Sequence, residues 1–111
     1  MGGRQMSGKD EFVVVYCTAP QEEADALART LVQERLAACV NIAPVRSCYI
    51  WEGMLNLDPE ALLIIKTSRG RFEALRKRIV ELHSYSLPEI IALPVSEAHQ
   101  PYLDWVGRSV G

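Results

Sequence analysis

Residues 81–95 read ELHSYSLPEIIALPV, and this stretch decides the fold because a helix must end within it and a strand must begin. Pro88 cannot continue a helix and biases Leu87 toward an extended conformation, so we expect the helix to end near Ser84. The apolar run that follows predicts a strand over residues 89–95. Three polar side chains gather at this corner: His83, Tyr85 and Glu89.

The rest of the chain alternates between strand-like and helix-like segments. Runs of β-branched and aromatic residues predict strands over residues 11–18, 38–51 and 61–67. Apolar residues at helical spacing predict helices over residues 20–36, in the segment that leads to the corner, and over residues 101–108. This order is that of an α+β, ferredoxin-like βαββαβ sandwich with a short C-terminal helix.

The second and third strands are expected to form a hairpin. Pro44 lacks a backbone N–H, so the second strand should lie at an edge of the sheet or break into two pieces there. Turn residues occur at Glu52 and Gly53 and again over residues 56–59. Two turn signals in succession predict a long, protruding connection rather than a tight one.

The ferredoxin-like arrangement brings distant residues to one edge of the sheet. Neighbouring strands are antiparallel and the first and third strands are central. Lys66 is then expected at the opposite edge. The corner should share its edge with the end of the first strand and with the hairpin. The side chains expected there are Cys17, Trp51, Glu52, His83, Tyr85 and Glu89.

Length and charge restrict the class of protein. The chain has 111 residues and a formal net charge of −2. This length accommodates one domain, which we place at residues 11–108, after a flexible N-terminal tail over residues 1–10. The basic side chains are spread among acids, so we expect no nucleic acid partner. No apolar run approaches the roughly 20 residues that cross a bilayer, so we expect no membrane partner.

The cysteines indicate a reducing compartment. Cys17, Cys39 and Cys48 are widely spaced, and none forms a C-x-x-C pair. This pattern argues against a disulfide scaffold and against a self-contained zinc ribbon. Each cysteine is most simply a small apolar side chain. Free thiols of this kind predict a reducing, intracellular compartment.

The predicted sheet has more apolar surface than its helices can cover. Two helices cover one face, yet three of the four strands are apolar on both faces. An uncovered apolar face of this size would not stay exposed to water, and the C-terminal helix is too short to hide it. A second copy of the chain is the expected cover, so the sequence predicts a homo-oligomer.

Six segments stand out along the chain: CTAP (17–20), RLAACVNI (35–42), SCYIWEG (47–53), IKT (65–67), LHSYSLPEIIALPV (82–95) and YLDWV (102–106). Taken together, they resemble the CutA family of divalent-cation tolerance proteins. The resemblance covers about residues 11–108, in order and at family-like spacing. It implies a cytoplasmic, ferredoxin-like homotrimer, similar in architecture to the PII signalling proteins and associated with tolerance of copper and other divalent ions.

The resemblance also implies metal ligands. Carried over residue by residue, they are Cys17 of the CTAP segment and His83 of the corner, and Glu89 is our candidate for a third group. A thiolate and an imidazole suit copper(II) or zinc better than calcium or magnesium. A structural alternative stays open, because Cys17 can pack at a strand end and His83 can cap a helix C-terminus. Two ligands alone do not fill a tetrahedral site.

The remaining side chains favour binding over catalysis. Tyr49, Trp51, Tyr85 and Trp105 can line a small-molecule cleft or pack where subunits meet. No nucleophile beside a base and no glycine-rich phosphate loop is visible, so we expect no enzyme. The leading prediction is a non-enzymatic, trimeric divalent-cation tolerance protein that binds Cu(II). Two alternatives are a PII-like signalling trimer that binds a small metabolite in clefts between subunits, and a structural trimer that scaffolds a partner.

Overall fold

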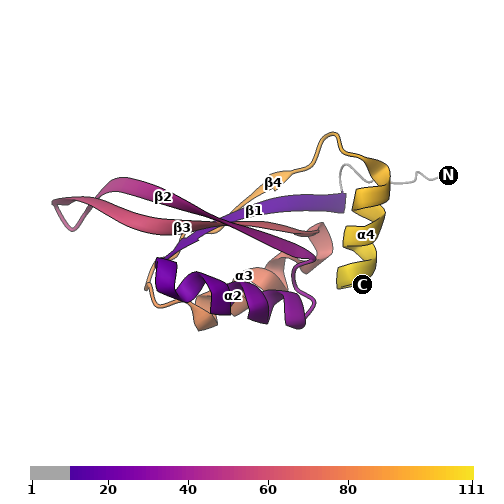
Figure 1. Ribbon diagram of the computed structural model, residues 1–111, viewed down its shortest axis with the longest axis horizontal. Helices are drawn as coiled ribbons and strands as arrows, with labels where there is room; N and C mark the ends of the chain where they lie inside the picture. Colours follow the sequence, from indigo (N-terminus) through magenta and orange to yellow (C-terminus); the bar gives the residue numbers. More distant parts are fainter. Residues whose placement is uncertain (1–10) are drawn as a thin grey trace.

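The computed structural model describes residues 11–111. The predicted tail, residues 1–10, lies outside the described residues. Figure 1 shows two helices on one face of a sheet and a third helix at the end opposite the hairpin tip. The elements in chain order are β1 (Phe12–Ala19), α2 (Gln21–Gln33), β2 (Cys39–Trp51), β3 (Met54–Ser68), the 3-10 turn η1 (Arg69–Arg71), α3 (Phe72–Leu82), β4 (Ile91–Pro94) and α4 (Gln100–Val110).

The sheet confirms the predicted ferredoxin-like topology. Its strand order is β2-β3-β1-β4, and every neighbouring pair is antiparallel. The central strands are therefore β1 and β3. Tyr16 of β1 lies opposite Ile64 of β3 on one side and Ile91 of β4 on the other, which fixes the register across the sheet.

The main core lies between the sheet and the pair of helices α2 and α3. Side chains alternate along a strand, so every second residue of β1 and β3 points to the helices. The fully buried contributors are Val15 and Cys17 of β1, Leu63 and Ile65 of β3, Leu31 of α2, and Leu75 and Ile79 of α3. Burial of each large aliphatic side chain stabilises the fold by about 1.5–3 kcal/mol.

The hairpin is longer and more regular than the sequence predicts. β2 is unbroken through Pro44, which pairs with Ala61, so the prediction of two pieces was wrong. The segment 56–59, expected to be a turn, is part of β3. Both departures have one cause. β2 is an edge strand, and β3 lacks its second neighbour before Ala61, so Pro44 and Pro59 each stand where an absent N–H is tolerated.

The other predicted boundaries shift by a few residues. α2 ends at Gln33 rather than near residue 36, because Arg35 adopts a left-handed conformation with φ of 60°. Strand β4 is confined to four residues, and α4 extends one residue earlier and two later than expected. Within the described residues, no helix is long and apolar enough to span a bilayer.

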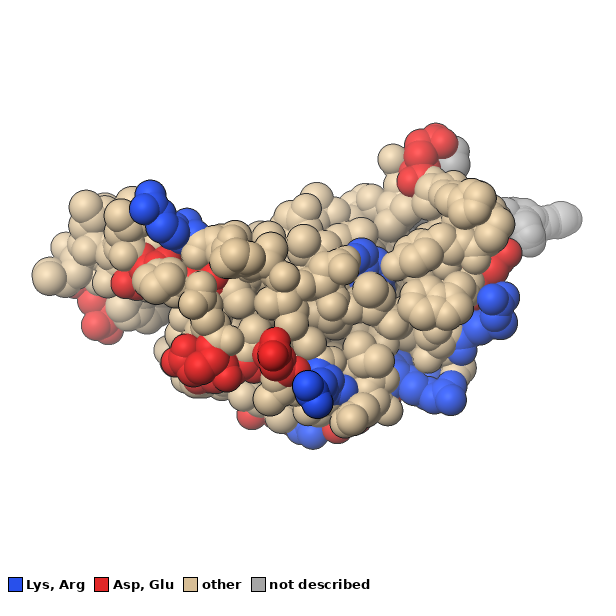
Figure 2. All heavy atoms as spheres, viewed as in Figure 1, with Lys and Arg blue, Asp and Glu red and all other residues tan. Residues whose placement is uncertain are grey.

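Helix α4 forms a second, smaller cluster at one end of the sheet. Phe12 packs with Leu103, Val106 and Val110 there, and Arg71 Nε donates a 2.7 Å hydrogen bond to the Val110 carbonyl. The helix therefore closes the end of β1 but leaves the second face of the sheet open. In Figure 2, uncharged residues form most of the visible surface over the hairpin tip and the middle of the sheet.

Candidate functional site

The corner after α3 is held by a histidine that bonds in three directions. The His83 N–H donates to the Ile79 carbonyl at 2.8 Å and ends the helix, while the residue itself is extended. Ring Nδ1 accepts from the Tyr85 N–H at 3.1 Å, and ring Nε2 lies 2.8 Å from the Thr18 carbonyl. Because Nδ1 accepts, the proton must be on Nε2, which donates to Thr18. The neutral ring thus ties the corner to the end of β1.

Tyr85 connects the same corner to β3. Its hydroxyl donates a 2.7 Å hydrogen bond to Glu60 Oε2, and its ring centroid is 4.7 Å from that of His83. Burial, and then the hydrogen bond to Glu60, raise the pKa of the Tyr85 hydroxyl above its usual range. The phenol stays protonated and can act only as a donor to this carboxylate.

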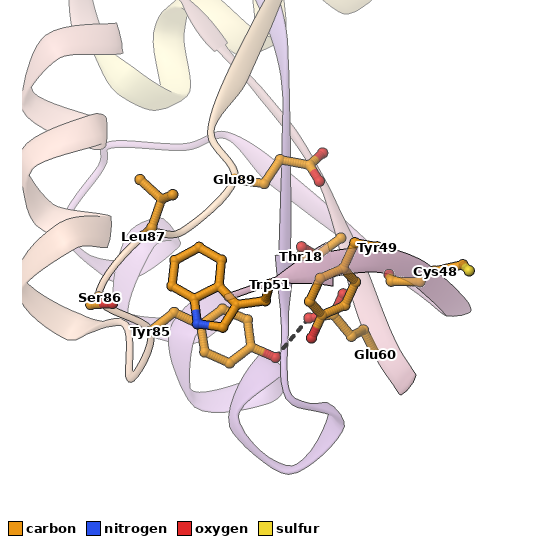
Figure 3. Close-up of a pocket in the computed structure, with 10 residues that line it drawn as sticks. Thr18, Cys48, Tyr49, Trp51, Glu60, Tyr85, Ser86, Leu87 and Glu89 are labelled. Carbon is orange, nitrogen blue, oxygen red and sulfur yellow. Dashed lines mark hydrogen bonds between the residues drawn. The ribbon is translucent and has the colours of Figure 1, made fainter. Parts of the chain in front are cut away.

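A cavity of about 560 Å³ opens beside this corner (Figure 3). The corner, the hairpin and the end of β1 all contribute to its wall. The lining side chains are Thr18, Ser47, Cys48, Tyr49, Trp51, Glu60, Tyr85, Ser86, Leu87 and Glu89. Two carboxylates and three aromatic rings therefore face one hollow, and the described lining includes no lysine, arginine or histidine.

The two carboxylates of the cavity differ in their surroundings. Glu60 is only 5% exposed and accepts from Tyr85, whereas Glu89 is exposed and makes no hydrogen bond or ion pair with another described residue. Both act on Cys17 in the neighbouring core. Burial first, and then the negative charges of Glu89 and Glu60, raise the pKa of the Cys17 thiol to about 12.

The proposed metal ligands come close to one another but do not form a ready site. Cys17 has no exposed surface, its thiol is protonated at neutral pH, and its Sγ donates to the Thr18 carbonyl at 3.7 Å. Both ring nitrogens of His83 are occupied by hydrogen bonds. Among residues 11–111, no group of three metal-binding side chains is assembled. In this arrangement the residues do not fit a bound soft metal ion, and the metal site stays a prediction.

The sequence located part of the site and missed part of it. Trp51, Tyr85 and Glu89 line the cavity, as expected of a shared edge, but Glu52 does not. Lys66 pairs with Val14 and lies toward the other end of β1, as predicted. Glu60 was missed because its segment looked like a turn. A lone acid directly before the apolar run ALLII was the available signal.

Comparisons with known proteins agree with this architecture. The sequence profile of the CutA1 divalent ion tolerance proteins matches residues 13–109. The chain is 48% identical over 100 residues to the divalent-cation tolerance protein CutA of Thermus thermophilus, covering 88% of this chain and 97% of that protein. It is also 48% identical over 99 residues to the chloroplastic protein CutA of Arabidopsis thaliana, covering 87% of this chain and 54% of the plant protein.

Solved structures with a similar fold also come from CutA proteins. The structure of the PII-like protein CutA from a Nostoc species, in its apo form, matches with a TM-score of 0.86 and 36% identity, over 89% of this chain and 97% of that chain. The plant relative is chloroplastic, so these relatives do not confirm a cytoplasmic location. The resemblance seen in the sequence is confirmed by profile, identity and fold together. The chain belongs to the CutA1 divalent ion tolerance protein family.

Proposed function

We propose that this chain acts as a non-enzymatic homotrimer in divalent-cation tolerance, and that it binds its ligands, as a PII-like protein, in clefts between subunits. One observation carries the proposal. Thr18 and Glu60 of the cavity point to the same uncovered face of the sheet as Tyr16 and Ile64, because alternate residues of a strand share a face. A second copy laid on that face would border the cavity and turn it into a cleft.

The surface around the cavity supports self-association. On the uncovered face, Ile91 is 51% exposed and Leu93 is 41% exposed. At the hairpin tip, Ile50 and Leu55 are paired across the turn and are 71% and 73% exposed. Contiguous apolar surface of this kind marks an interaction site. The PII-like fold supports a threefold arrangement, and we propose that three copies bury this surface.

The cavity also supports binding without catalysis. Its described lining contains hydroxyl and thiol groups at Thr18, Ser47 and Cys48, but no histidine or lysine beside them that would activate a nucleophile. Its two acids are Glu60, which is held by Tyr85, and Glu89, which is solvent-exposed. Recognition is the role that such a lining serves best. The free thiols support a cytoplasmic setting.

A soft-metal site is the second candidate, and one observation favours it. Glu89 and Glu60 are close enough to Cys17 to act on its thiol, and His83 bonds to the residue that follows Cys17. Copper(II) or zinc bound by Cys17, His83 and Glu89 would require His83 to release at least one of its two ring hydrogen bonds. It would also require Cys17 to lose its proton, so metal binding at this place should release protons and weaken as the pH falls.

Calorimetric titration with Cu(II) and Zn(II) tests both candidates on the fully reduced, metal-free protein. Binding at a fixed ratio per chain that is lost in Cys17→Ser and His83→Ala would establish the soft-metal site. Binding that survives in Cys17→Ser but is lost in Glu89→Gln would assign the ion to the cleft. Glu52→Gln, on the hairpin but outside the cavity lining, is the control. Binding unchanged in all variants would contradict a role for this corner.

A further inference from the structure

The acidic, aromatic cavity has a chemistry of its own, distinct from that of the soft-metal candidate. It contains two carboxylates, three aromatic rings and no basic side chain among the described residues that line it. We propose that this cavity binds a small organic cation with an alkylammonium group, placed between the carboxylates and the aromatic rings. The inference rests on the proposed role of the cavity as a ligand cleft, and it names the class of ligand.

Glu60 presents one free carboxylate oxygen to the cavity. The Glu60 residue is only 5% exposed, and the Tyr85 hydroxyl donates to Oε2 but not to Oε1. No described residue donates to Oε1, yet none of the described buried oxygens lacks a hydrogen-bond partner. Oε1 must therefore reach the open space of the cavity. A carboxylate with one oxygen fixed and the other free is a preorganised acceptor for a cationic donor.

Glu89 adds a negative charge to the cavity. It forms no ion pair with a described residue, whereas the arginines of α3 pair elsewhere, Arg76 with Glu73 and Arg78 with Glu34 and Glu81. The cavity therefore keeps an uncompensated negative charge. A partly enclosed, low-dielectric wall strengthens the attraction of such charges for a cation.

The aromatic rings decide which kind of cation fits. Figure 3 shows the indole of Trp51 and the phenol rings of Tyr49 and Tyr85 near the Glu60 carboxylate, with Glu89 set apart from the rings in this view. Tyr49 is anchored by a 2.8 Å hydrogen bond from its hydroxyl to Asp58, and Tyr85 by its bond to Glu60. Ring faces attract ammonium groups, and this attraction is the usual basis of quaternary ammonium recognition.

Size and ligand number favour an organic cation over a bare ion. A volume of about 560 Å³ exceeds what one metal ion and its shell need, and it lies within the range of small-molecule pockets, about 300–1,000 Å³. Two carboxylates supply too few oxygens for calcium, which takes six to eight. The exposed Leu87, at 70%, adds an apolar wall that a hydrated metal ion would not use.

The test compares two compounds of the same shape. Choline and its neutral carbon isostere, 3,3-dimethylbutan-1-ol, are titrated calorimetrically into the full chain at matched ionic strength, after its mass has been measured by light scattering. Choline should bind about tenfold more tightly, because cation–π and carboxylate attraction act only on the charged compound. Glu89→Gln should weaken choline binding about tenfold and leave the isostere unchanged. Glu52→Gln should change neither.

The outcomes separate the inference from the proposed function. Equal binding of the two compounds would overturn the cation inference and leave the ligand cleft in place. No binding by a chain of trimer mass would overturn the inference alone, whereas no binding by a monomer would overturn both. Calcium binding that Glu89→Gln abolishes, without any choline binding, would also overturn the cation inference. Choline binding that emerges only in Lys66→Met would overturn it too, because a lysine of a second copy would then occupy the cavity.

Discussion

The two faces of the sheet differ sharply although the same strands build them. Along β1, Val15 and Cys17 have no exposed surface on the face that α2 and α3 cover, while Tyr16 between them is 37% exposed on the other face. Along β4 and the hairpin, apolar side chains remain open to solvent. The covered face is a complete core within one chain, and we interpret the open face as half of an interface that additional copies complete.

The first prediction compares the same substitution at a position of β3 that the helices cover and at a position of β3 that lies beyond them and is exposed. Leu63→Ala, at a fully buried position of β3, should lower the free energy of unfolding by about 2–5 kcal/mol, because it leaves a cavity in the core. Urea denaturation measures the loss. Leu55→Ala, at the exposed hairpin tip, should act through association, so its effect should depend on protein concentration. Equal losses at every concentration would remove the distinction.

The second prediction concerns the corner that joins the covered core to the cavity. His83→Ala should lower the free energy of unfolding by about 1–3 kcal/mol, because the Thr18 carbonyl and the Tyr85 N–H lose their partner. Ser84→Ala, at the exposed neighbouring position, is the control for thermal or urea denaturation. If His83→Ala and Ser84→Ala lower the free energy of unfolding equally, the ring hydrogen bonds of His83 do not stabilise the corner.

The third prediction uses two tyrosines that each donate to a carboxylate. Tyr85→Phe should cost about 1–2 kcal/mol, because Glu60 is buried and loses its donor. Tyr49→Phe removes a 2.8 Å bond to Asp58 on the exposed hairpin and should cost clearly less than Tyr85→Phe, because water can replace the lost donor. The difference in denaturation midpoint between the two variants measures how much more the buried Tyr85–Glu60 bond contributes to stability than the exposed Tyr49–Asp58 bond. A larger loss of stability in Tyr49→Phe would contradict this order.

The fourth prediction is the smallest and concerns Cys17. Its folded pKa of about 12 lies above the ordinary thiol value of 9.0, so its contribution to stability is complete below about pH 9 and is lost as the pH rises toward 12. We expect the free energy of unfolding to fall by about 1 kcal/mol between pH 8 and pH 10, and to change less with pH in Cys17→Ala.

The exposed Cys48 should react with a thiol reagent in the folded protein, and Cys17 only after unfolding. Fast labelling of Cys17 in the native state would contradict its burial.

The sequence predicted features that depend on local patterns. Pro88 placed the corner to within two residues of the observed end of α3 at Leu82, and alternating apolar residues indicated the uncovered face. It failed where the environment overrides the local signal. Pro44 and the residues 56–59 look like breaks, but β2 is an edge strand and β3 has no second neighbour before Ala61, so a missing N–H is tolerated there. The bond of Tyr85 to Glu60 and the bond of His83 to the Thr18 carbonyl span 25 and 65 residues of chain, which no local pattern records.

Light scattering of the reduced wild-type chain at micromolar concentration tests the central claim most directly. We expect a mass three times that of the 12.4 kDa chain, because the open face and the apolar hairpin tip need additional copies to leave water. Leu55→Asp should shift that mass downward. A mass of 12.4 kDa for the wild type would contradict the account, since the open face would then be stable in water on its own.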